Sequence, residues 1–125
     1  MELPVSKNDK FTYSDKIPQG FYKAVMGDWS LPYESVFLED PVEGVAYYEA
    51  INFCNRLCEI YEIAPTYLVF SDGSIFMNNP KGVRLLTEEE LKGLNIDMKG
   101  YQEWSLGGKV VGEGLLLSFR VCMNH

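Results

Sequence analysis

The segment 45–61, VAYYEAINFCNRLCEIY, constrains the fold of this chain more than any other feature. Its apolar side chains recur with the 3.6-residue period of an α-helix, whereas Glu49, Asn55, Arg56 and Glu59 lie off that stripe. A helix with one apolar face must bury that face against another element, so the segment predicts a helix packed on a core. The predicted apolar face consists of Tyr47, Ala50, Ile51, Cys54, Leu57, Cys58 and Tyr61.

Length and composition describe an ordinary globular domain. The chain has 125 residues, of which 46% are hydrophobic and 23% are charged, enough for one domain with a sizeable core. The net charge of −7 leaves no basic footprint for nucleic acid, and it would also repel an anionic membrane surface. No apolar run approaches the roughly 18 residues of a membrane span. We therefore expect a single domain over residues 1–125, with protein, small-molecule or glycan partners and neither nucleic acid nor membrane.

The N-terminal stretch 1–17 holds few hydrophobic residues and lacks the apolar core of a signal peptide. As written, the sequence predicts a cytoplasmic protein, whereas a mature domain trimmed from a longer precursor would lie outside the cytoplasm. Residues 1–17 are expected to form an arm or a single edge strand, with 1–14 as the N-terminal arm of the domain.

Local signals indicate two further helices. Apolar residues at helical spacing, followed by Gly27, predict a short helix near Gln19–Met26. In LTEEELKGL, Thr87 can cap a helix while Glu90 reaches back to complete a capping box. That helix is expected to stop at Gly93.

Strand signals occupy the second half of the chain. TYLVF (66–70) and SIFMN (74–78), joined through Ser71-Asp72-Gly73, predict a β-hairpin. The apolar run 114–123 predicts one buried strand, and the stretch 29–44, with its prolines and glycine, predicts an ordered loop. Helices and strands in this order, with heavy loops, predict an α+β fold.

Four segments, taken in their order along the chain, resemble the formylglycine-generating enzyme (sulfatase-modifying factor) family. They are PVEGVAYYEA at 41–50, PTYLVFSDGSIFMNNPKGVRLLTEEE at 65–90, YQEWSLGG at 101–108 and SFRVC at 118–122. That family has a variant of the C-type lectin fold. The resemblance therefore implies a loop-rich, C-type-lectin-like domain in which two main helices pack on a small, mostly antiparallel sheet.

The same resemblance implies that the family's copper chemistry is missing. In the enzyme, two cysteines hold copper between a Gly-Gly-Ser element and the closing Gly-Phe-Arg. Here KVVGEGLLL follows Gly107 and Gly108, and the next cysteine is Cys122. A calcium-associated asparagine of related enzymes is Gly100 here, and the single histidine, His125, cannot form the histidine set of iron-dependent relatives. We therefore expect no catalytic residues, no bound copper, zinc, calcium or other cofactor, and a natural loss of the catalytic segment.

The chain has three cysteines, Cys54, Cys58 and Cys122. In oxidised relatives the cysteines at the positions of Cys54 and Cys122 form a disulfide, so the resemblance implies that these two residues are bridged or are close thiols. Cys58 lies one helical turn from Cys54, and three neighbouring thiols could bind a soft metal such as Cu(I) or Zn(II). The other interpretation is that all three serve as small buried hydrophobic residues.

C-type-lectin-like scaffolds often carry recognition on their loops. The loop Trp29–Asp40 and the segment Asn95–Gly108 are the surfaces expected to bind a partner. Aromatic side chains commonly anchor such contacts, although they could equally cover a small core. The candidate anchors are Trp29, Tyr33, Phe37, Tyr101 and Trp104.

Three functions remain open on the sequence. The resemblance without its copper residues favours a non-catalytic, minimal sulfatase-modifying-factor-like domain that acts as a protein- or ligand-binding or assembly module. An enzymatic alternative is a residual copper- or thiol-dependent oxidase that uses Cys54, Cys58 and Cys122. The third is a subunit that completes its core by homodimerisation or by docking on a larger protein.

Overall fold

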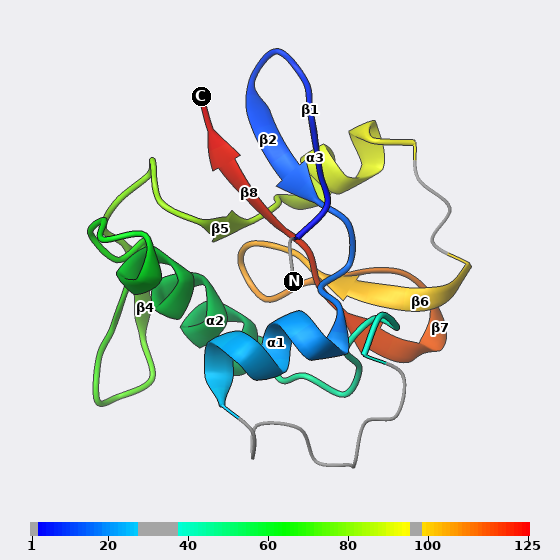
Figure 1. The fold of residues 1–125 in the computed structure, drawn as a ribbon, viewed down its shortest axis with the longest axis horizontal. Coiled ribbons are helices and arrows are strands. Elements are labelled where there is room, and N and C mark those ends of the chain that lie inside the picture. The colour runs from blue at the N-terminus through cyan, green and yellow to red at the C-terminus, as the bar shows by residue number, and fades with distance from the viewer. Residues whose placement is uncertain (1–2, 28–37, 96–98) are drawn as a thin grey trace.

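The computed structural model describes residues 3–27, 38–95 and 99–125. Within these ranges it contains three helices, α1 (Gln19–Met26), α2 (Tyr47–Ile60) and α3 (Glu88–Gly93), and eight strands (Figure 1). The strands form small antiparallel sheets, so the α+β class predicted from the sequence is confirmed. None of the described helices has the length and apolar character needed to traverse a bilayer.

The largest sheet contains four strands and runs through the middle of the molecule (Figure 1). Every neighbouring pair in it is antiparallel. In spatial order its strands are β1 (Val5–Lys7), β2 (Phe11–Ser14), β8 (Val121–Asn124) and β5 (Arg84–Leu85).

The N-terminal residues differ from the predicted arm or single edge strand, because β1 and β2 form a hairpin inside this sheet. The side chain of Asn8 accepts hydrogen bonds from the backbone N–H groups of Lys10 and Phe11, both at 2.9 Å, and so fixes the turn. β2 then pairs with β8, with Tyr13 opposite Cys122. The sequence did not indicate this arrangement because all three residues of β1 are exposed and two of them are polar.

Helix α2 forms where the amphipathic stripe predicted it, and it covers one side of the sheet. The residues of the predicted face that are buried are Ala50, Ile51, Cys54, Leu57 and Cys58. Tyr61 is instead 52% exposed, because the helix ends before it. Phe53, which the predicted face left out, is fully buried and stacks on Tyr22 of α1 with ring centroids 5.7 Å apart. Phe119 meets the same Phe53 ring edge-on at 5.2 Å.

Helices α1 and α3 also follow the sequence prediction. α1 has the predicted bounds. At the start of α3, Thr87 Oγ1 accepts from the backbone N–H of Glu90 at 3.1 Å, and Glu90 Oε1 accepts from that of Thr87 at 2.9 Å. The predicted capping box is therefore confirmed, and α3 ends at Gly93 as expected.

Two apolar clusters hold the elements together. The larger cluster lies among α1, α2 and the main sheet, and Val121 of β8 belongs to it. The smaller cluster joins Leu91 of α3 to Phe11, Leu86 and Cys122. Since Val121 and Cys122 are consecutive residues of one strand, β8 has a core on each of its two faces.

The C-terminal apolar run differs from the single strand predicted over 114–123. β7 (Val110–Ser118) pairs with β6 (Lys99–Trp104) in a separate sheet, and only β8 joins the main sheet. Between them the guanidinium of Arg120 turns inward and donates to both carboxylate oxygens of the fully buried Glu103, at 2.7 and 2.9 Å. This buried ion pair fixes the place where the chain leaves one sheet and enters the other.

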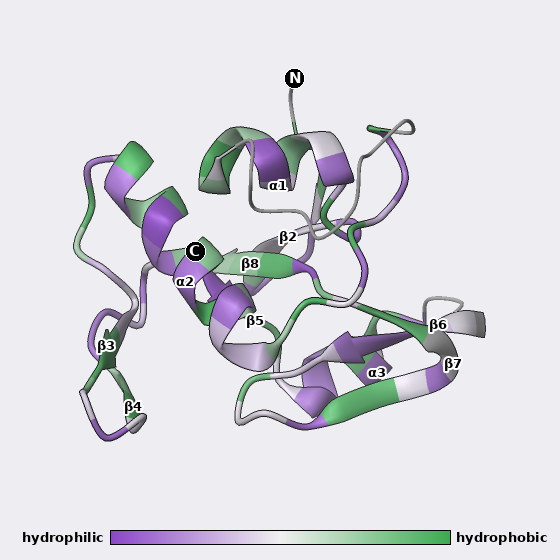
Figure 2. Cartoon of the chain, turned by 90° about the horizontal axis from the view of Figure 1, so that it is seen from below, coloured by the Kyte–Doolittle hydropathy of each residue, from purple (hydrophilic) through white to green (hydrophobic). Residues whose placement is uncertain are grey.

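The hairpin predicted between residues 66 and 78 is confirmed as β3 (Tyr67–Val69) and β4 (Ile75–Met77). These two strands form a sheet of their own, which extends from the body of the molecule beside α2 in both overall views (Figures 1 and 2). Asn55 of α2 holds the base of β3. Its side chain donates to the carbonyl of Tyr67 at 2.9 Å and accepts from the N–H of the same residue at 3.0 Å.

Candidate functional site

The three cysteines are free thiols buried in the core. Cys58 lies in a closed hydrogen-bond network, in which its sulfur accepts from the backbone N–H of Val83 at 3.3 Å and lies 3.2 Å from Thr66 Oγ1. The Thr66 hydroxyl donates its own proton to the carbonyl of Val83, so the Cys58 thiol is the donor in its contact with Thr66. Cys58 therefore acts as a packed, hydrogen-bonded thiol.

Electrostatics make the other two cysteines poor nucleophiles. Burial raises the pKa of Cys54 well above its usual value, and the neighbouring sulfurs of Cys58 and Cys122 raise it further. Burial also raises the pKa of Cys122 to about 12, even though the Arg84 guanidinium acts in the opposite direction. Because the thiolate is the reactive and metal-binding form, these shifts oppose thiol chemistry near neutral pH. Among the described residues, no three His, Cys, Asp or Glu side chains are placed to hold a metal ion.

Of the five aromatic anchors expected from the sequence, Trp29, Tyr33 and Phe37 lie outside the described residues. Tyr101 and Trp104 both lie on β6, but they do not form one patch. The Tyr101 ring lies under the ammonium of Lys16, 4.6 Å from nitrogen to ring centroid. Trp104 is half-buried and its indole Nε1 donates inward to the carbonyl of Val45 at 2.7 Å, which makes it mainly a core anchor.

An open cleft of about 470 Å³ lies between the start of α2, the β3–β4 hairpin and the turn after β6. Tyr47 stands on its wall, packs against the Trp104 ring at 5.5 Å and accepts from the backbone N–H of Gly107 at 3.1 Å through its hydroxyl. Tyr67 is almost fully buried below, and its hydroxyl accepts from the backbone N–H of Leu85 at 3.1 Å. The cleft is lined by Tyr47, Tyr67, Gly73, Ile75, Met77, Leu106 and Gly107.

The hairpin that borders this cleft exposes apolar side chains on both of its faces. Leu68, Phe70 and Phe76 share the outer face and are 42%, 52% and 56% exposed. Val69 and Met77 belong to the face toward the cleft and are 49% and 44% exposed. We call these five residues the hairpin patch. An antiparallel hairpin that only faced water would place polar residues on its outer face, so the patch is an apolar surface without a partner among the described residues.

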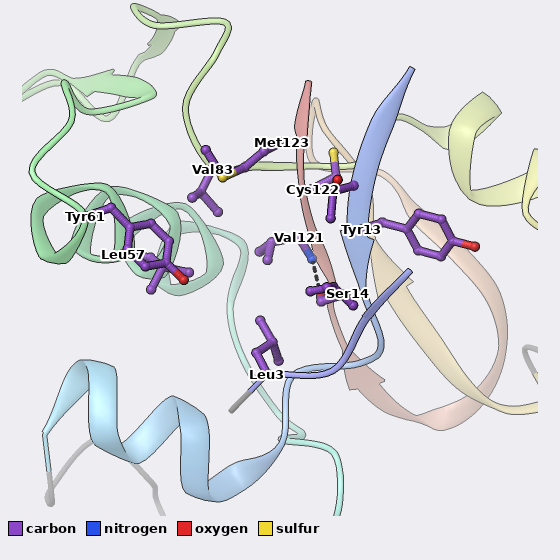
Figure 3. A pocket seen from close by; sticks show the side chains of 11 residues that line it. Leu3, Tyr13, Ser14, Leu57, Tyr61, Val83, Val121, Cys122 and Met123 are labelled. Atoms are coloured by element: carbon purple, nitrogen blue, oxygen red, sulfur yellow. Dashed lines mark hydrogen bonds between the residues drawn. The ribbon is translucent and has the colours of Figure 1, made fainter. Parts of the chain in front are cut away.

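A smaller apolar cavity of about 80 Å³ lies between α2 and the strands β1, β2 and β8 (Figure 3). Leu57 of α2 and Tyr61, which directly follows that helix, line it on one side, while Val121 and Met123 of β8 line it on the other. Ser14 Oγ accepts from the backbone N–H of Val121 at 3.0 Å at its edge. Ligand pockets usually measure about 300 Å³ or more, so this cavity is a packing defect rather than a ligand site.

Sequence reasoning did not single out the hairpin patch, although it predicted the hairpin itself. The signal was present, since residues 66–70 and 74–78 contain apolar side chains at consecutive positions and lack the alternation of a half-buried strand. Such a run was compatible with a strand covered on both faces. What the sequence could not show is that no other element covers the outer face in the described structure.

Two solved structures share the fold of this chain. The Treponema denticola variable protein 1 aligns with a TM-score of 0.59 and 17% identity, over 97% of this chain and 91% of that protein. The crystal structure of CarF aligns with a TM-score of 0.63 and 16% identity, over 100% of this chain and 94% of that one. At such low identity the likeness concerns the fold alone. No protein-family model matches the chain, and no curated protein matches it.

Proposed function

We propose that this chain is a non-catalytic, minimal domain of the sulfatase-modifying factor type, with a C-type-lectin-like fold, and that it acts as a protein-binding or assembly module. The observation that carries the proposal is the hairpin patch, an apolar surface on a projecting element beside an open cleft. Surfaces of this kind on otherwise acidic domains are typical of protein interaction sites.

Two of the segments on which the resemblance rests contact each other in the core. Glu103 comes from YQEWSLGG and Arg120 from SFRVC, and the two form the buried bidentate ion pair between β6 and the start of β8. Two segments that each resemble a motif of the family thus meet at one point of the structure. Trp104, next to Glu103, ties the same strand to the start of α2 through Val45.

The alternative, a residual copper- or thiol-dependent oxidase, is less well supported. It needs a thiolate near neutral pH from among Cys54, Cys58 and Cys122, whereas burial raises the pKa of Cys54 and Cys122 and Cys58 is enclosed by hydrogen bonds. All three sulfurs are also buried, so a peptide substrate could not reach them without local opening. Binding requires no such opening, since the hairpin patch already faces solvent.

Site-specific cross-linking tests this proposal. A photoreactive phenylalanine analogue replaces Phe76 in one sample and Tyr48 in another; Tyr48 is 62% exposed on α2 and serves as the matched control. We expect discrete cross-linked protein species from position 76 and none from position 48. The same labelling pattern at both positions, or none at either, would refute the hairpin as a binding surface. Copper-dependent oxidation of a cysteine-containing peptide by the purified chain would refute the non-catalytic assignment.

A further inference from the structure

We propose that the partner of the hairpin patch is a second copy of this chain, bound through the free edge of β4 so that two hairpins form one continuous four-stranded sheet. This inference rests on the proposed function, because it takes the hairpin as the binding surface and names what occupies it. It goes beyond the proposed function because it names the partner, the strand that makes the contact and the register of the two strands.

The hydrogen bonds of the hairpin leave one edge of β4 open. Asn78 N donates to Thr66 O at 2.7 Å at the base, and Phe70 N donates to Ser74 O at 2.9 Å at the turn. In an antiparallel ladder such bonded pairs alternate with pairs whose backbone groups point outward. By this alternation the first and last residues of β4 point their N–H and C=O groups away from β3, where no strand pairs with them in the described structure.

The opposite edge of the hairpin, on β3, is bonded to α2 at its base. There the side-chain amide of Asn55 donates to the C=O of Tyr67 and accepts from its N–H, as the backbone of a neighbouring strand would. The β3 edge is thus held by α2 at Tyr67, whereas no strand pairs with the β4 edge in the described part of the chain. Unpaired edges are the usual sites of strand addition by another chain.

A twofold axis through residue 76 fits this free edge. If two copies of β4 run antiparallel about that axis, Ile75 of one copy lies opposite Met77 of the other, and each such pair exchanges two hydrogen bonds. Phe76 then lies opposite Phe76 of the second copy in a non-hydrogen-bonded pair, with Cα atoms about 4.5 Å apart. The outward amides of β4 are the ones that this register requires, so no residue of the hairpin has to change its pairing with β3.

The distribution of charge permits two copies to meet along β4 and opposes contact between their other surfaces. The chain carries a net charge of −7, so two copies repel each other over most of their surfaces. Residues 63–80 contain only one charged side chain, Asp72, which lies in the turn of the hairpin. An acidic chain can therefore approach its own copy along β4 at little electrostatic cost.

The size of the patch sets the strength of the contact. Five apolar side chains that are roughly half exposed offer on the order of 400 Å² per copy, given about 150–250 Å² for an aromatic side chain. Two such patches lie below the roughly 1,200 Å² of a standard specific interface. We therefore expect a reversible dimer in the micromolar range, with most of the contact contributed by Phe76 and Phe70.

The test uses charged substitutions at the twofold axis. Sedimentation equilibrium of the full chain should show a concentration-dependent mass between one and two copies. Phe76→Glu and Phe76→Lys should each be monomeric at the same concentrations, because each places like charges opposite each other. An equimolar mixture of the two variants should form more dimer than either variant alone at the same total concentration, since glutamate then faces lysine; unfolding of either variant could not produce this increase.

Met77→Pro and Val110→Glu complete the design. Met77→Pro removes an N–H that does not bond β3, so the hairpin should persist while dimerisation is lost. Val110→Glu adds a charge at a position that is 40% exposed on β7 and should leave the dimer intact. A monomer at all concentrations, or a dimer that Phe76→Glu and Met77→Pro do not weaken, overturns the inference. If cross-links from position 76 then contain a different protein, the binding module stands and only the second copy is refuted.

Discussion

Residue 46 stands at the N-cap of α2, where a side-chain oxygen usually accepts from the first free N–H groups of a helix. Glu49 accepts from the backbone N–H of Ala46 at 2.9 Å, but alanine has no oxygen with which to return the bond. We predict that Ala46→Ser raises the free energy of unfolding by about 1 kcal/mol by completing the capping box. Urea denaturation measures the change, and Ala46→Val, which adds bulk without an acceptor, should give no such gain.

The thiols provide a second prediction at the scale of single residues. Because Cys54, Cys58 and Cys122 are buried and the pKa values of Cys54 and Cys122 are raised, the native protein should react only very slowly with iodoacetamide near neutral pH. All three should react at once in denaturant. Mass spectrometry counts the added groups. Rapid labelling of a native cysteine would contradict the buried, protonated state and would revive the thiol-oxidase alternative.

The raised pKa of Cys122 also makes stability depend on alkaline pH. The thiol is neutral in the folded protein up to about pH 12 but ionises near its ordinary value of 9.0 when unfolded. The stability that the buried neutral thiol contributes is therefore fully present below pH 9.0. It is lost as the pH rises from 9.0 to about 12. We predict that the free energy of unfolding falls between pH 9 and 10, and falls less steeply in Cys122→Ala. Tyr22 contributes mainly above this window, since burial raises its pKa from 10.0 to about 12.

At the scale of elements, the ion pair between Glu103 and Arg120 joins β6 to the start of β8. Glu103 is fully buried, so removing one partner leaves a charge in the core with no buried counter-charge; the carboxylate of Asp15, 3.8 Å from Arg120 Nη1, is exposed to solvent. We predict that Glu103→Leu or Arg120→Met alone costs about 3–5 kcal/mol of unfolding free energy, while the two substitutions together recover most of it. A double-mutant cycle by chemical denaturation tests this. Additive losses in the double variant would show that the pair is not coupled.

The elements that the sequence predicted correctly are those with local signals. The stripe of α2 and the capping box of Thr87 and Glu90 involve residues at most a few positions apart, so short-range physics specifies them. β2 has no such signal, because its partner β8 lies more than a hundred residues away in the sequence. The run 114–123 was wrongly predicted as one strand because Arg120, which breaks it, is fixed by Glu103 on another strand.

At the scale of the whole molecule, the hairpin patch lies outside the segments that the sequence singled out as binding surfaces. The sequence-based prediction placed the binding surfaces at segments 29–40 and 95–108 because these segments contain aromatic residues in expected loops. The described residues expose the hairpin patch, while Trp104 directs its indole N–H inward to Val45. How far an element is exposed depends on which other elements pack against it. Here Asn55 of α2 contacts only one edge of the hairpin. Local sequence contains no information of that kind, which is why the hairpin could be predicted and its surface could not.

The net charge of the whole chain gives the last prediction, which concerns the proposed dimer. Each copy carries −7, so at low ionic strength the acidic bodies repel across the uncharged hairpin contact. Salt shortens the Debye length from about 30 Å at 0.01 M to about 8 Å at 0.15 M, which removes most of that repulsion. We predict that dimerisation strengthens several-fold over this range, as measured by sedimentation equilibrium at matched protein concentrations. Near the isoelectric point of about 4.6 the salt effect should largely disappear, because the repulsion has gone. A dimer that weakens with salt would mean that opposite charges meet in the interface, and the contact could not be the hairpin edge, where Asp72 is the only charged residue.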